Sequence, residues 1–216
     1  MSIASSCGTL PPVKSDYVPK GVITNVSGLD VYCIVPDSFA ETQTKNAGNA
    51  WTPEKFEKFK NEIHLVLDWL EKNAPPEKVH QLTTQVVDHL RKEYKIQNFG
   101  FIGYCWGGMI ASKHSKDPTF DACVLIHPGL LSIEDFKESQ CPIAFLPSKD
   151  EPDLESQYVK DPVLTSKPFA SKIVHHRFDM HHGFAGSKGD FKDPVNIEAV
   201  NKVVEISVKF LNENLG

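Results

Sequence analysis

The stretch FIGYCWGGMIAS, residues 101–112, decides the fold that this sequence predicts. It runs from an apolar segment into a pair of glycines, and a single cysteine, Cys105, lies between Gly103 and Gly107. G-x-Cys-x-G at the junction of a strand and a helix is typical of a nucleophile elbow, a sharp turn that strains the backbone of its central residue. Gly103 would let the strand end approach its partner, and Gly107 with Gly108 would let the helix approach. We expect Cys105 to stand above a sheet at a helix N-terminus, where the helix dipole lowers the pKa of a thiol.

The composition indicates a globular protein. The chain has 216 residues, of which 40% are hydrophobic, so we predict a single domain over residues 20–216 after an extended N-terminal segment, 1–19. A net charge of −5 and a sequence pI of about 6.0 argue against partners such as nucleic acid or an anionic membrane. No stretch approaches the roughly 20 apolar residues that span a bilayer, and the N-terminus does not resemble a secretory signal.

The other four cysteines are predicted to be structural, because most free cysteines are buried packing residues. They are Cys7, Cys33, Cys123 and Cys141. Five cysteines without regular spacing argue against a disulfide scaffold and for a reducing compartment. We therefore expect a soluble, cytoplasmic protein.

Short apolar runs alternate with helical patterns along most of the chain. A strand, a turn at Ser27-Gly28 and a second strand are expected before Pro36, and a helix start is expected at Thr52. Helices are predicted near 77–94, 107–115 and the C-terminus, and strands at 99–104, 122–127, 142–147 and 172–178. This alternation predicts an α/β fold, a mostly parallel sheet with helices on both faces.

A thiol nucleophile needs a general base, which in an elbow-type hydrolase follows the nucleophile and the acid along the chain. The motif FDMHHGFAG, residues 178–186, follows the last predicted strand, where a base would have to lie. We predict His182 as the base, with His181 as the alternative. His175 and His176 fall within the predicted strand and are more typical of packing or surface positions. Adjacent histidines point apart, and no Cys-x-x-Cys or carboxylate-rich spacing accompanies them, so no metal site is predicted.

The acid that orients the base should follow the preceding strand, in the loop KDEPDLE at residues 149–155. Asp150 is the first carboxylate after that strand, and we predict that it has this role. Glu151 and Asp153 remain alternatives, because a loop can aim any of the three side chains.

With these motifs in place, the chain resembles the dienelactone hydrolase family, small α/β-hydrolases that use cysteine where most relatives use serine. The resemblance covers about residues 20–37 and 51–216. It rests on GYCWGG around Cys105, IHPG with His127, the acid loop, HGFAG after the last strand, and VPDSF at 35–39. It implies a small-molecule ester or lactone substrate, such as a dienelactone, and no cofactor.

The resemblance also implies roles for individual residues. Cys105 would attack the carbonyl, His182 would accept and return the proton, and Asp150 would fix the tautomer of the histidine. The backbone N–H of Trp106 would hold one side of the oxyanion, and His127 would contribute to substrate binding.

The chain departs from the family pattern in two places. A strand–loop–helix segment that normally supplies the second oxyanion N–H is expected to be absent between Tyr32 and Cys33, so we predict fewer strands than in the full fold. Where family members commonly carry a carboxylate-binding arginine after the histidine loop, this chain has Lys188, a point charge rather than a planar fork.

Two other functions remain open. A binding or scaffold relative of the same fold would keep the elbow without turnover. Glutamine amidotransferases also use G-x-Cys-x-G, but their base belongs to a His-x-Glu pair, which neither His127 nor His182 forms.

Overall fold

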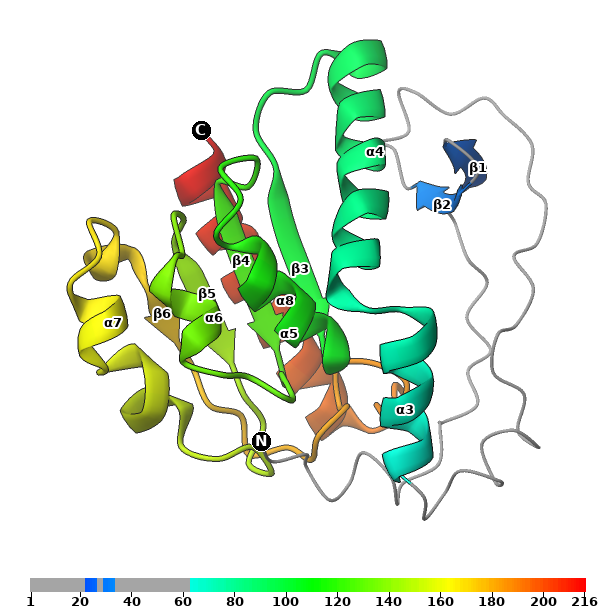
Figure 1. Cartoon of the computed structure of the whole chain (residues 1–216). Coiled ribbons are helices and arrows are strands. Elements are labelled where there is room, and N and C mark those ends of the chain that lie inside the picture. Colours follow the sequence, from blue (N-terminus) through cyan, green and yellow to red (C-terminus); the bar gives the residue numbers. More distant parts are fainter. Residues whose placement is uncertain (1–21, 27–28, 34–62) are drawn as a thin grey trace. The chain divides into compact units, whose positions relative to one another are not determined.

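The computed structural model describes residues 22–26, 29–33 and 63–216 (Figure 1). The chain divides into two compact units, one containing Asn98–Gly216 and the other Lys14–Gln97. The predicted N-terminal segment, 1–19, and the helix start at Thr52 lie outside the described residues. That residues 20–216 form one domain stays a prediction.

The described part of the unit 14–97 contains two paired strands and two helices. Strands β1 (Val22–Val26) and β2 (Leu29–Cys33) pair antiparallel, which confirms the two predicted strands, whereas the turn predicted at Ser27-Gly28 lies outside the described residues. Helix α3 (Ile63–Asn73) precedes α4 (Pro76–Tyr94), which begins with a proline in its first turn, where the missing N–H costs nothing.

The unit 98–216 is built on a parallel sheet. Its four strands are β3 (Gly100–Tyr104), β4 (Ala122–Ile126), β5 (Ile143–Leu146) and β6 (Val174–His175), in the order β3-β4-β5-β6. The predicted parallel α/β arrangement is confirmed. Strand β6 is shorter than the predicted run 172–178: a 3₁₀ turn, Ala170–Lys172, overlaps its first residue, and the strand ends at His175.

Helices cover both faces of this sheet. Helix α8 (Pro194–Leu215) lies behind it in Figure 1, and α5 (Trp106–His114) and α6 (Glu134–Lys137) lie in front. Behind the sheet, alternate residues of β4 and β5 form a core with Val203 and Phe210 of α8. In front, the ring of Phe145 packs 5.5 Å from that of Phe136 in α6. Every residue of β4 is buried, as expected for a parallel strand covered on both sides.

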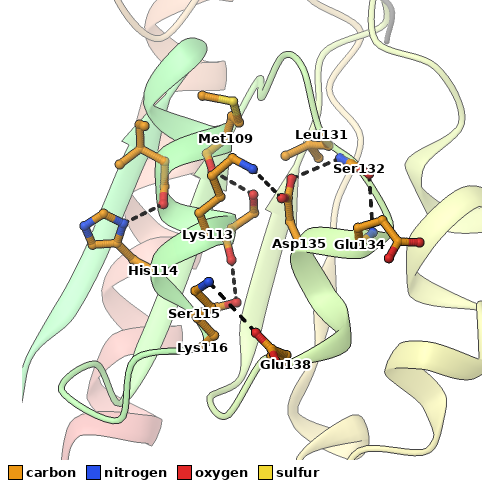
Figure 2. Close-up of polar contacts among 12 residues, drawn as sticks. Met109, Lys113, His114, Ser115, Lys116, Leu131, Ser132, Glu134, Asp135 and Glu138 are labelled. Carbon is orange, nitrogen blue, oxygen red and sulfur yellow. Dashed lines mark hydrogen bonds and ion pairs between the residues drawn. The ribbon is translucent and has the colours of Figure 1, made fainter. Parts of the chain in front are cut away.

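Ion pairs hold the front helices together. Lys113 of α5 lies 2.6 Å from the carboxylate of Asp135 in α6, and the looser pair of Lys116 with Glu138 is exposed (Figure 2). A short helix, α7 (Pro162–Thr165), is capped by Asp161, whose side chain accepts a hydrogen bond from the backbone N–H of Val163.

Because the strands are parallel, their C-terminal ends meet at one edge of the sheet, the usual location of a site in such folds. The turn at Cys105 and the loops after β4, β5 and β6 all begin there. None of the described helices is both long and apolar enough to cross a membrane.

Candidate active site

Cys105 lies at the sharp turn between β3 and α5. Its φ of 54° and ψ of −117° belong to a region that side chains other than glycine rarely adopt, at a cost of about 1–3 kcal/mol. Its backbone N–H donates to the Ile126 carbonyl (3.1 Å), and its own carbonyl accepts from Gly108 and Gly129. These bonds fix the strained turn and leave the half-buried thiol at the N-terminus of α5.

The glycines have partly different functions from those predicted. A Cβ at Gly103 would lie 1.9 Å from the carbonyl oxygen of Gly107, and one at Gly108 would lie 2.5 Å from Pro128. A Cβ at Gly107 would meet nothing within 4 Å, so the prediction that Gly107 lets the helix approach was wrong. The backbone carbonyl of residue 107 occupies the space that a side chain at Gly103 would need, so the close approaches depend on Gly103 and Gly108.

His182 bridges the thiol and a carboxylate. Its Nε2 lies 3.0 Å from Sγ of Cys105, and its Nδ1 lies 2.6 Å from Oε1 of Glu151. The His182 and Glu151 side chains are both 2% exposed, so water screens their interaction little. A carboxylate can only accept this bond, so Nδ1 carries the proton and Nε2 is left as the acceptor that faces the thiol.

The carboxylate on the ring belongs to Glu151, whereas the sequence analysis predicted Asp150. Oδ2 of Asp150 instead accepts the backbone N–H of His182 at 2.9 Å. The third alternative, Asp153, is exposed and accepts from Ser156 at the start of the next helical turn. The chain turns immediately after β5, and the longer Glu151 side chain reaches the imidazole from this turn.

Arg177, which the sequence analysis missed, holds this turn in place. Its guanidinium donates to the carbonyls of Lys149 (2.8 Å), Pro152 (3.0 Å) and Glu151. Three bonds from one planar group fix the backbone on both sides of Glu151. An arginine just beyond a short strand carries no signal that identifies such a role.

The alternative base, His181, has another partner. Its Nε2 donates to the backbone carbonyl of Lys188 at 2.9 Å, which ties together the two ends of the loop 181–188. His175 lies half-buried in β6, and the ring of His176 packs 4.6 Å from that of Phe178. Of the four histidines in these two adjacent pairs, the structure brings only His182 to the thiol.

His127, the first residue after β4, lies against the candidate base. The His127 ring is 2% exposed, and its centroid lies 5.0 Å from that of His182. Neither ring nitrogen of His127 has a hydrogen-bond partner among the described residues. Burial, together with the nearby His182, lowers its pKa to about 3, so the imidazole is neutral at physiological pH.

Trp106 follows Cys105 directly in the chain, and Lys188 lies six residues after His182. Trp106 is the first residue of α5, so its backbone N–H belongs to the N-terminal turn beside Cys105. Lys188 is 8% exposed, and the stem of its side chain lies against Gly183.

No group of three or more metal-binding side chains occurs within the described residues.

A family model described as the dienelactone hydrolase family matches residues 32–215. The chain belongs to this family. The match therefore bears out the resemblance noted from the elbow and the histidine loop.

Individual proteins are also similar to this chain. An AIM2 family protein of Schizosaccharomyces pombe is 29% identical over 145 residues, which are 67% of this chain and 59% of that protein. A carboxymethylenebutenolidase homolog of Mus musculus is 23% identical over 185 residues, 83% of this chain and 69% of the homolog. This chain thus spans only part of the length of its curated relatives.

The fold has solved counterparts. A dienelactone hydrolase-like promiscuous phosphotriesterase from metagenomic libraries has a TM-score of 0.51 and 18% identity, covering 72% of this chain and 68% of that one. The likeness shows that the two chains share an α/β-hydrolase fold.

Proposed function

We propose that this protein hydrolyses carboxylic ester or lactone bonds, with Cys105 as nucleophile, His182 as general base and Glu151 as the group that orients the base. The observation that carries the proposal is the continuous row of contacts from Sγ to Nε2 (3.0 Å) and from Nδ1 to Oε1 (2.6 Å). Nucleophile, base and orienting acid within hydrogen-bond reach are the arrangement that activates a thiol.

In the first half of the reaction, the Cys105 thiol gives its proton to Nε2 of His182, and the thiolate attacks the carbonyl carbon. A new S–C bond forms while the carbonyl π electrons move to oxygen. The tetrahedral intermediate collapses when the C–O bond to the alcohol breaks. Nε2 then returns its proton to the departing alkoxide, which leaves an acyl thioester on Sγ.

In the second half, His182 takes a proton from a water molecule, and the resulting hydroxide attacks the thioester carbonyl. The S–C bond breaks, the carboxylic acid departs, and Sγ recovers its proton from Nε2. Glu151 keeps Nδ1 protonated throughout and stabilises the imidazolium that forms twice in the cycle.

Three further residues are assigned to the substrate in this proposal. The backbone N–H of Trp106, at the N-terminus of α5, donates to the oxyanion, an interaction worth about 3 kcal/mol in related sites. His127 offers an unpaired, neutral imidazole next to His182. Lys188 supplies the positive charge for an anionic substrate group, by analogy with the arginine that the family commonly carries after this loop.

Hydrolysis of p-nitrophenyl acetate by the wild type and Cys105→Ala tests the proposal. We expect the variant to lose hydrolysis, and the wild type to show an acetylated species in intact-mass spectra that the variant lacks. Hydrolysis by Cys105→Ala at the wild-type rate would contradict the proposal.

Thiol labelling gives a second measurement that does not need turnover. Iodoacetamide should modify Cys105 faster than Cys123 or Cys141, which are 0% and 2% exposed. The neighbouring Cys141 and burial raise the pKa of Cys123 well above its usual value, so that thiol should react slowly. Equal labelling of the three thiols would argue against an activated Cys105.

A further inference from the structure

A cavity of about 250 Å³ lies at the edge of the sheet that carries the candidate site, between the loop after β4 and the segment after β5. Leucines and prolines line most of it: Pro128, Leu130, Leu131, Pro152 and Leu154. Whole ligands of drug size occupy pockets of about 300–1,000 Å³, so this cavity is sized for part of a substrate.

The cavity adjoins the reacting groups on two sides. Pro128 follows His127, whose ring packs on His182, and Pro152 follows Glu151, which bonds to the same imidazole. Between Pro128 and Leu130, the backbone N–H of Gly129 donates to the carbonyl of Cys105 at 3.1 Å. One wall is therefore bonded directly to the backbone of the nucleophile.

Hydrogen bonds hold both walls in place. The Tyr158 hydroxyl, from the segment after β5, donates to the backbone carbonyl of Leu131 at 3.0 Å. Asp135 accepts from the backbone N–H of Ser132 and pairs with Lys113, which fixes the loop after β4 onto α5 (Figure 2). The cavity is thus formed before any ligand enters.

The same loop carries backbone strain. His127 has a φ of 34° and Leu130 a φ of 62°, both in the region that side chains other than glycine rarely adopt. Two such residues within four positions cost the fold energy, and strain of this kind is concentrated at functional sites.

The lining carries no charge. Tyr158 and Gln157 are its polar residues, and the Tyr158 hydroxyl is already bonded. Along the chain, the carboxyl groups of Glu151, Asp153 and Glu155 alternate with lining residues. The carboxylate of Asp135 lies close enough to Tyr158 to raise the pKa of its hydroxyl. The guanidinium that bonds to the lining, that of Arg177, already donates to three backbone carbonyls. An anionic substituent would therefore meet mostly negative charge, whereas an aliphatic chain would be buried against leucine and proline side chains.

We propose that this cavity, the acyl pocket, binds the uncharged aliphatic acyl chain of the substrate. This assignment rests on the proposed function, because in that mechanism the acyl group is the part of the substrate that stays bonded to Sγ of Cys105. The wall of the pocket that contains Gly129 is bonded to the Cys105 backbone, on the face of the sheet covered by α5. The loop that carries His182 packs through Phe184 into the core on the opposite face, which α8 covers. The acyl chain therefore extends over the front of the sheet, and the alcohol departs toward Nε2.

Ester hydrolysis with a constant leaving group tests the pocket. From p-nitrophenyl acetate to butyrate, kcat/KM should rise about four-fold for each methylene, the gain expected when a methylene leaves water. A succinate half-ester, which carries a terminal carboxylate, should be hydrolysed more slowly than the butyrate. Gln157→Trp, at an exposed position on the rim of the cavity, should abolish the gain in kcat/KM with chain length.

Lys160→Trp is the matched control, because it adds the same bulk three residues away at a position that does not line the cavity. It should keep the chain-length gain. Leu131→Ala, which widens the pocket, should move the preference to longer chains, and circular dichroism would check that each variant folds. A wild type without chain-length dependence, or a gain lost equally in Lys160→Trp, would overturn the proposal.

Alkylation of Cys105 separates the pocket from the proposed hydrolysis. N-hexyl iodoacetamide should modify Cys105 faster than iodoacetamide does, and Gln157→Trp should remove the difference. Faster hexyl labelling without any ester turnover would support the pocket and overturn the hydrolase proposal. Ester turnover with equal labelling by the two reagents would overturn the pocket alone.

Discussion

Replacing Glu151 with glutamine tests which carboxylate orients His182. Oε1 of Glu151 accepts from Nδ1 of His182, and Oε2 accepts the backbone N–H of Ser148. A glutamine has one oxygen and one NH₂ group in these two places. The NH₂ group of the glutamine would then face either the N–H of Ser148 or the Nδ1–H of His182. In the first case the turn after β5 would lose its bond, and in the second the tautomer of His182 would no longer be fixed.

The size of the effect follows from burial. Both side chains are 2% exposed, and breaking a buried charged pair by removing one partner costs about 3–5 kcal/mol. His182 is an imidazolium in the transition states, so this loss falls on catalysis. At 1.36 kcal/mol for each factor of ten, we expect kcat to fall by about 150- to 5,000-fold.

Asp150→Asn is the matched control on the neighbouring residue. The carboxylate of Asp150 accepts a backbone N–H, and the asparagine carbonyl can accept the same bond. We expect kcat to fall less than about 10-fold, in line with the roughly 1 kcal/mol that such an exchange costs. Initial rates with p-nitrophenyl acetate, with thermal melts to check folding, measure both variants. If Asp150→Asn lost more activity than Glu151→Gln, the assignment of Glu151 would be refuted.

Three other predictions follow from the same geometry. Arg177→Ala should lower kcat about 10-fold by freeing the turn that carries Glu151, with Arg177→Lys intermediate, as measured by steady-state rates. Gly103→Ala should destabilise the fold by about 3 kcal/mol, because its Cβ would lie 1.9 Å from a carbonyl oxygen, whereas Gly107→Ala should stabilise α5 by up to about 1 kcal/mol in denaturant titrations. The unfolded chain protonates His127 near pH 6.5 and the folded chain near pH 3, so the wild type should lose up to about 4–5 kcal/mol of stability as pH falls through this range. His127→Phe should lose less stability over this range, and an unchanged loss would contradict the buried, neutral imidazole.

Long and strongly patterned elements could be predicted from the sequence. The apolar run before Cys105, the buried strand β4 and the C-terminal helix all agree with the structure, because each pattern extends over several residues of one element. The short elements could not. Helices α6 and α7 were not predicted, because four residues are too few for a helical period to be visible. The strand expected at 172–178 is present, but only Val174–His175 form it.

The sequence by itself determined the turn at Cys105 and the order in which this turn, the loop 149–155 and the histidine loop meet at one edge of the sheet. The crowding at Gly103 involves Gly107, only four positions away, so a short sequence motif is enough to reveal it. Parallel strands end at the same edge of the sheet whatever residues their loops contain. Only the tertiary structure decided between Asp150 and Glu151. Adjacent side chains in a loop point in different directions, and here Arg177, 26 residues further along the chain, fixes the backbone that aims them.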